Sequence, residues 1–139
     1  MKVISLHQPW ASWVALGWKT IETRTHSRFK NLVGQTIGIH AAKHWDKDWN
    51  PKGYCYYTWK QFKETRDSLS LNAPRGFLIA TAYVEEFRLL NYRDSQKAIC
   101  CCDDNNLFGL VLSNIARIEP IKMDGRQGIF NYEGEIIYL

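Results

Sequence analysis

The sequence predicts a single small α+β domain: a strongly bent, mainly antiparallel sheet of five to six strands with two or more helices packed on it. Its 139 residues, 45% of them hydrophobic, suit one hydrophobic core. Short β-rich segments separated by turn residues recur along the chain, and only two segments repeat apolar residues at helical spacing. Low-complexity tracts, linkers and internal repeats are missing from the sequence, so we expect residues 1–139 to form one domain.

The N-terminal segment predicts a strand followed directly by a helix. Residues 2–6 are rich in apolar and β-branched side chains, which is typical of a strand. Pro9 suits the first position of a helix, where its missing N–H costs nothing, and Gly17 provides a stop signal. Tryptophans and valine at helical spacing between them predict a helix over 9–18. Gln8 therefore lies at a strand-to-helix junction, a common place for side chains that face a ligand.

Two further strands are predicted before the middle of the chain. Residues 20–25 alternate as a strand does, which places Glu22 and Arg24 on one face. Residues 35–42 form another β-rich run. From 46 to 57 the chain is charged, aromatic and interrupted by proline and glycine, so a loop or a short helix is expected there.

The second half of the chain predicts one helix and then mostly strands. Residues 58–69 place aromatic and apolar side chains near one helical face. Residues 77–87 and 107–118 are the two most regular β-rich runs. The C-terminal segments 128–132 and 135–139, separated by Glu-Gly, predict a hairpin.

Charge is unevenly distributed along the chain. Residues 1–63 carry ten Lys and Arg against three acidic residues, whereas residues 64–139 carry eight against eleven. A basic half rich in Trp and Tyr is the composition that polyanion binding requires, because cations neutralise phosphates while aromatic rings stack on bases. An uneven solvated surface explains the charge equally well.

The cysteine pattern and the hydropathy exclude several classes of protein. The four cysteines, at 55 and 100–102, have neither the spread of a disulfide framework nor the C-x-x-C spacing of a zinc site, so we expect reduced thiols and no metal. No cofactor is expected either. The first residues include no apolar run of signal-peptide length, and no stretch approaches the roughly 20 apolar residues that span a bilayer. A soluble cytoplasmic protein without membrane contact is the expectation.

Five short segments together resemble the motifs of the ASCH domain, a family of the PUA-like superfamily of β-barrel folds. They are 8–12 (QPWAS), 17–24 (GWKTIETR), 39–43 (IHAAK), 74–82 (PRGFLIATA) and 125–130 (GRQGIF). The resemblance covers most of the chain except residues 45–72. The motif G-x-K-x-x-E-x-R becomes specific when the two flanking blocks accompany it.

The resemblance implies a PUA-like small β-barrel with a cleft between barrel and helices, whose floor carries Lys19, Glu22 and Arg24. PUA-like relatives read RNA, and some hold a modified base in a pocket, which a cleft flanked by Trp10 and His40 would suit. Arginine offers a planar fork for a phosphate or a base edge, lysine a point charge, and glutamate an acceptor for an exocyclic amine.

Each of these residues also has a purely structural interpretation. Glu22 and Arg24 could form an exposed ion pair of little consequence for stability. The helical repeat of tryptophans favours core packing, which leaves a stacking role for Trp10 alone. His40 and Lys43, at the end of a strand, could belong to the core or the rim rather than contact a ligand.

Three functions remain open, in decreasing order of preference. The first is binding of RNA, another nucleic acid or a nucleotide. The second is amide hydrolysis on a modified nucleoside, with Lys19 and Glu22 as catalytic residues, which the resemblance to one ASCH-type group implies. That group has a threonine nucleophile where this chain has Glu22. Here a water activated by the Lys–Glu pair would therefore replace the covalent step. The third is a metal-independent ribonuclease that stabilises the phosphoryl transition state with Lys19 or Arg24.

Overall fold

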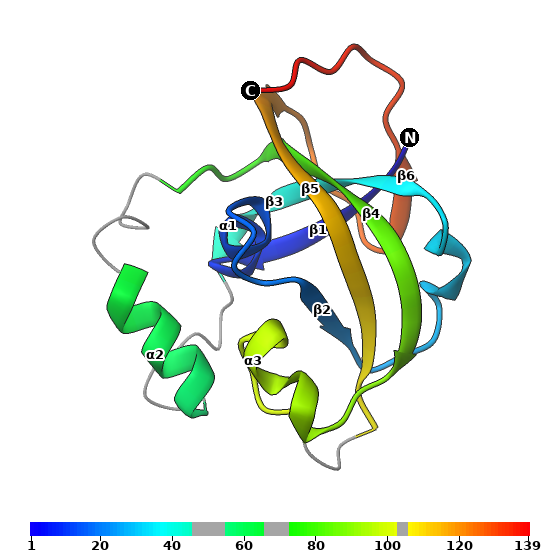
Figure 1. Ribbon diagram of the computed structural model, residues 1–139. Coiled ribbons are helices and arrows are strands. Elements are labelled where there is room, and N and C mark those ends of the chain that lie inside the picture. The colour runs from blue at the N-terminus through cyan, green and yellow to red at the C-terminus, as the bar shows by residue number, and fades with distance from the viewer. Residues whose placement is uncertain (46–54, 66–72, 103–105) are drawn as a thin grey trace.

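The computed structural model describes residues 1–45, 55–65, 73–102 and 106–139. They form one six-stranded sheet with three α-helices (Figure 1). In chain order the elements are β1 (Lys2–Gln8), α1 (Trp10–Ala15), β2 (Ile21–Arg24), β3 (Thr36–Trp45), α2 (Tyr56–Thr65), β4 (Phe77–Leu89), α3 (Ser95–Ala98), β5 (Phe108–Lys122) and β6 (Ile129–Asn131), with short 3₁₀ turns at Lys30–Leu32 and Tyr92–Asp94.

The sheet is mixed but mainly antiparallel, which confirms the predicted α+β class. Its strand order is β2-β5-β4-β3-β1-β6, and the β1–β3 pair is parallel whereas the other neighbours are antiparallel. In the described part of the chain β2 and β6 are the two edges and do not pair with each other. A barrel requires that its edge strands close by hydrogen bonding, so the expected barrel is an open, curved sheet.

Curvature comes mainly from the long β4–β5 pair, which bends across the molecule in Figure 1. The pairing of these strands shifts register at three places. Such irregularities bend and twist a strand pair. Asn114, with φ of 47°, lies in this irregular region of β5 and is a residue type that tolerates the left-handed conformation.

A continuous core lies inside the curve of the sheet. Strand side chains such as Ile4, Ile39, Ala80 and Leu110 are fully buried there. Helix α1 closes one side of this core with Val14 and neighbouring residues of the same face. None of the described helices combines the length and apolar character that would let it cross a membrane.

Most predicted elements occur, with shifted ends. The helix predicted over 9–18 is shorter, because Pro9 is its N-cap and Gly17, with φ of +79°, follows the C-cap residue in the left-handed conformation. The helix predicted over 58–69 begins two residues earlier, at Tyr56, and its predicted residues 66–69 lie outside the described residues. Most of the loop or short helix expected over 46–57 also lies outside them. Both long strands extend beyond the predicted ends.

The predicted C-terminal hairpin is wrong. Strand β6 pairs with β1, and Tyr138 forms an isolated bridge to Ile118 of β5. The physical reason is burial, since this arrangement packs Phe130 against Val3 and Ile118 in a second apolar cluster. The sequence does not predict helix α3, because four residues are too few to show a helical period.

Candidate functional site

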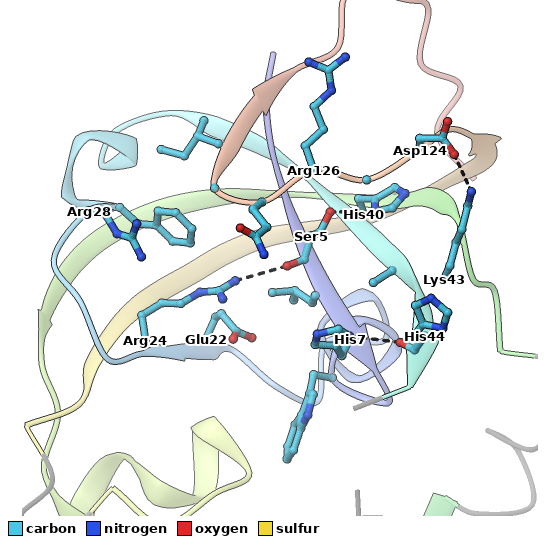
Figure 2. A pocket seen from close by; sticks show the side chains of 18 of the residues that line it. Ser5, His7, Glu22, Arg24, Arg28, His40, Lys43, His44, Asp124 and Arg126 are labelled. Carbon is cyan, nitrogen blue, oxygen red and sulfur yellow. Dashed lines mark hydrogen bonds and ion pairs between the residues drawn. The ribbon is translucent and has the colours of Figure 1, made fainter. Parts of the chain in front are cut away.

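A cleft of about 1060 Å³ lies where four distant parts of the chain meet (Figure 2). Its lining comes from some of the residues in each of four segments: 5–10 at the β1–α1 junction, 22–29 on and after β2, 40–44 at the end of β3, and 124–129 before and in β6. The strand order brings three of these parts together, because β6 and β3 flank β1 on either side. Residues more than a hundred positions apart therefore share one cavity.

The cleft is positively charged. Among the described residues, four cationic side chains line it against two carboxylates: Arg24, Arg28, Lys43 and Arg126 against Glu22 and Asp124. All four histidines of the chain, at positions 7, 26, 40 and 44, line it as well. The site therefore favours anions, and more strongly once histidines gain protons.

Strand β2 delivers Glu22 and Arg24 to the cleft from one face, as its alternation predicts. Glu22 is only 7% exposed, and its buried Oε2 atom has no hydrogen-bond partner among the described residues. Arg24 directs Nη2 toward the Ser5 carbonyl oxygen at 3.5 Å and holds its guanidinium 4.8 Å from the Phe29 ring. Its Nε atom is buried and, in the described part of the chain, also lacks a partner.

No ion pair joins Glu22 to Arg24 among the described residues. The surface ion-pair interpretation therefore does not describe this structure. Instead both side chains line the cavity, and each keeps one buried polar atom without a hydrogen-bond partner, as far as the described residues extend. A buried polar atom without a partner carries a cost of about 1–3 kcal/mol.

His40 lies in the cleft wall, fully buried and bonded at both ring nitrogens. Nε2 is 3.0 Å from the Met123 carbonyl oxygen and Nδ1 is 2.9 Å from the Ser5 hydroxyl. A carbonyl can only accept, so Nε2 carries the proton and Nδ1 accepts from Ser5. Burial lowers the pKa of His40 below its ordinary value, although the bond to Met123 opposes the shift. The ring is therefore neutral near pH 7.

The tryptophans at 10, 13 and 18 differ in burial, although their helical repeat predicts core packing for all three. Trp13 is fully buried and packs edge to face on Trp10 at 5.2 Å, while Trp10 itself also lines the cleft. Trp18, in contrast, is 40% exposed and lies outside the cleft lining. Among the described residues, Trp10 is thus the tryptophan placed to stack on a ligand in this cavity.

Two of the expected site residues do not line the cleft. Lys19 is 1% exposed; its ammonium donates to the Ala98 carbonyl and lies 5.3 Å from the Trp10 ring. Gln8 is fully buried, donates to the Pro74 carbonyl at 2.7 Å and accepts from the Ser12 amide at 3.0 Å. Both side chains support the elements around the cleft, so the expectation that Lys19 forms its floor is corrected.

Lys43 occupies the rim, where it pairs with Asp124 at 2.7 Å. The bond from Lys43 lowers the pKa of Asp124. Both side chains are mostly exposed, with 63% and 85% of their surface accessible, so this pair is weak and can open for a ligand.

Sequence reasoning missed several lining residues, among them His26, Arg28 and Arg126. His26 and Arg28 follow Arg24 at two-residue spacing, on the segment directly after β2, whereas Arg126 lies on a separate part of the fold. The sequence contains a signal for Arg126 as well, because this residue falls in the segment 125–130, which resembles an ASCH motif. Among the described residues no group of three or more His, Cys, Asp or Glu side chains is placed to hold a metal ion.

Comparison with known proteins identifies the fold. No family model matches the sequence, and no curated protein matches it. Among solved structures, the crystal structure of ASCH from Zymomonas mobilis superposes with a TM-score of 0.59 at 16% identity, covering 95% of this chain and 87% of that one. The chain has an ASCH fold. Two single-residue mutants of the same Zymomonas protein match with TM-scores of 0.57 at 15% and 14% identity, covering 95% of this chain and 87% and 89% of theirs.

Proposed function

We propose that this ASCH-fold protein binds RNA, or a nucleotide segment of one, in the cationic cleft. The observation that carries the proposal is the convergence of four cations and all four histidines on one cavity with only two carboxylates, counted over the described residues. Phosphate neutralisation supplies most of the affinity of such sites, and a neighbouring aromatic ring adds stacking. Trp10 provides that ring.

The dimensions of the cleft favour a strand segment over a single base. Small-molecule sites enclose roughly 300–1,000 Å³. At about 1060 Å³, this cavity lies at the upper end of that range and is larger than a single base requires. A pocket closed around one base would favour chemistry on a modified nucleoside.

Glu22 and Arg24 are the residues we propose to read the ligand. The carboxylate of Glu22, which lines the cleft, accepts the exocyclic amine of a base. The guanidinium of Arg24 donates to a phosphate or to an acceptor on a base edge. Lys43 and the two arginines at 28 and 126 contact the backbone phosphates. His40 holds this wall in place through its two bonds.

Fluorescence anisotropy with a labelled single-stranded RNA of ten nucleotides, titrated at several salt concentrations, tests this proposal. The parent should bind, and Arg126→Ala should reduce the slope of log affinity against log salt by about 0.7, the value for one single-strand phosphate contact. Arg117→Ala is the matched control, because Arg117 is exposed on β5 outside the cleft lining. Failure of the parent to bind, or equal effects of the two variants, overturns the proposal.

The amidohydrolase that uses Lys19 and Glu22 has less support. Such a mechanism needs the Lys19 ammonium beside the reacting carbonyl, and this ammonium donates to the Ala98 carbonyl from a buried position outside the cleft lining. Of the two residues, Glu22 alone retains access to the cavity.

A further inference from the structure

A serine hydroxyl and an imidazole face each other inside the cleft, and their geometry also suits a chemical step that nucleic-acid binding does not use. Ser5 of β1 and His40 of β3 are register partners in the parallel strand pair. Their Oγ and Nδ1 atoms lie 2.9 Å apart, and both residues line the cavity (Figure 2). Ser5 is half-buried, so its hydroxyl belongs to the wall rather than to the core.

The imidazole is held in the orientation that a general base requires. Its Nε2–H donates to the Met123 carbonyl at 3.0 Å, which leaves the Nδ1 lone pair directed at the serine. Burial keeps the ring neutral near pH 7 by lowering its pKa, while Asp124 and Lys43, the charged groups that face it, act in opposite directions. A hydroxyl, a neutral base and a third group that orients the base are the parts of a nucleophile–base triad.

A glycine, Gly125, packs directly against this pair. A Cβ atom on Gly125 would lie 2.6 Å from His40 Cε1 and 2.8 Å from Ser5 Oγ, so no other residue fits there without displacing one of them. On the other side, the Arg24 guanidinium approaches the Ser5 carbonyl oxygen. A cation therefore lies beside the same stretch of cleft wall, where it can stabilise the negative charge that develops on the carbonyl oxygen of an attacked ester.

We propose that Ser5 and His40 form a nucleophile–base pair that hydrolyses carboxylic esters carrying a negative charge. The ester class follows from the hydroxyl–imidazole pair, and the negative charge of the substrate follows from the cleft cations at 24, 28 and 126. The reaction uses neither Lys19 nor Glu22 and goes beyond the proposed RNA binding.

The steps balance without any further reactant except water. Ser5 Oγ bonds to the ester carbonyl carbon as its proton passes to His40 Nδ1, and the imidazolium returns that proton to the departing alkoxide as the ester C–O bond breaks. Water then attacks the acyl-serine, with its proton taken by Nδ1, and the Ser5 hydroxyl reforms as the carboxylic acid leaves. The Met123 carbonyl accepts from Nε2–H throughout.

A fluorophosphonate probe tests the nucleophile directly in the parent protein. Ser5 Oγ should displace fluoride from phosphorus, and peptide mass spectrometry should find the adduct on Ser5. Ser27→Ala is the control, because Ser27 is an exposed serine between two cleft residues; it should leave labelling unchanged. Labelling of the parent decides the question even if a Ser5 variant fails to fold. A folded parent without an adduct on Ser5 overturns the proposal.

Turnover gives a second, independent measurement. The parent should hydrolyse mono-4-nitrophenyl succinate faster than the uncharged 4-nitrophenyl acetate, and Arg126→Ala should reduce this preference. Ser5→Ala, checked for folding by circular dichroism, should lower the succinate rate by about 100-fold, the lower end of the contribution of general-base catalysis. The rate should rise with pH through an inflection below 6.5, the ordinary histidine value, because the pKa of His40 is lowered. Unchanged turnover in Ser5→Ala refutes the ester hydrolase, whereas RNA affinity is measured separately and tests only the binding proposal.

Discussion

Glu22→Gln should make the protein more stable and its ligand recognition poorer. The carboxylate is 7% exposed, and one of its oxygens is buried without a partner among the described residues. An unsatisfied buried polar atom costs about 1–3 kcal/mol, more for a charged one. Removing the charge while keeping the shape should raise the free energy of unfolding by about 1 kcal/mol, which corresponds to a rise of about 3 °C in the melting temperature for a chain of this length.

Recognition should change in the opposite direction. If Glu22 accepts an exocyclic amine, oligocytidylate binds more tightly than oligouridylate, because uracil has no such amine. Gln keeps an acceptor oxygen but loses the charge assistance, worth about 1.5 kcal/mol, so the preference for cytosine should fall by about tenfold. Affinity for oligouridylate should stay constant or increase, since the cleft loses a negative charge.

Thermal unfolding by circular dichroism and anisotropy with the two homopolymers measure both effects. Glu119→Gln is the matched control, because Glu119 is exposed on β5 and outside the cleft lining. It should change neither the melting temperature nor the base preference. A Glu22→Gln variant that melts lower and keeps the parent's base preference would refute the assignment of an unsatisfied, ligand-facing carboxylate.

Three further predictions concern pH and stability. RNA binding at constant ionic strength should tighten between pH 7.5 and 5.5, and less so in His26→Gln, because burial and neighbouring arginines lower the pKa of His26 and bound phosphates would raise it again. Asp94→Asn should lower the free energy of unfolding, measured in urea at pH 7, by about 2 kcal/mol, since the bonds from Arg88 lower the pKa of Asp94 from 3.8 to about 2. The difference in stability between parent and variant should be lost as the pH falls from about 4 through 2. Gly17→Ala should cost about 1 kcal/mol, because φ is +79° there, and chemical denaturation would show it.

Local pattern predicts the strands well and their distant partners poorly. The β4 and β5 runs are recognisable because β-branched and apolar residues dominate them over long stretches. The pairing of β6 with β1 joins segments more than 120 residues apart, as in the pairing of Val3 with Phe130. Burial of apolar side chains decides such contacts, and no short-range spacing records them.

The site residues follow the same pattern: local spacing predicts the positions of some of them, and contacts between distant segments determine the positions of the others. Alternation along β2 places Glu22 and Arg24 on one face, and both reach the cleft. The same rule does not extend to Lys19, which precedes the strand. The histidines at 7 and 44 meet because β1 and β3 run parallel, with the His7 ring nitrogen 3.3 Å from the His44 carbonyl oxygen. Their convergence is a property of the topology, which spacing alone does not contain.

The burial of Lys19 shows that the charged residues of one short motif have two different roles. The carbonyl groups at the C-terminal end of α3 need donors: Lys19 donates to the Ala98 carbonyl, and the Thr58 hydroxyl of α2 donates to the Ile99 carbonyl at 2.5 Å. Ile99 itself adopts φ of 55°, which ends the helix. Lys19 thereby fastens α3 beside β2, and the strand that follows directs Glu22 toward the cavity. The lysine of the motif supports the wall whose later residues face the ligand, so a loss of binding in Lys19→Ala would report a disturbed wall rather than a lost contact.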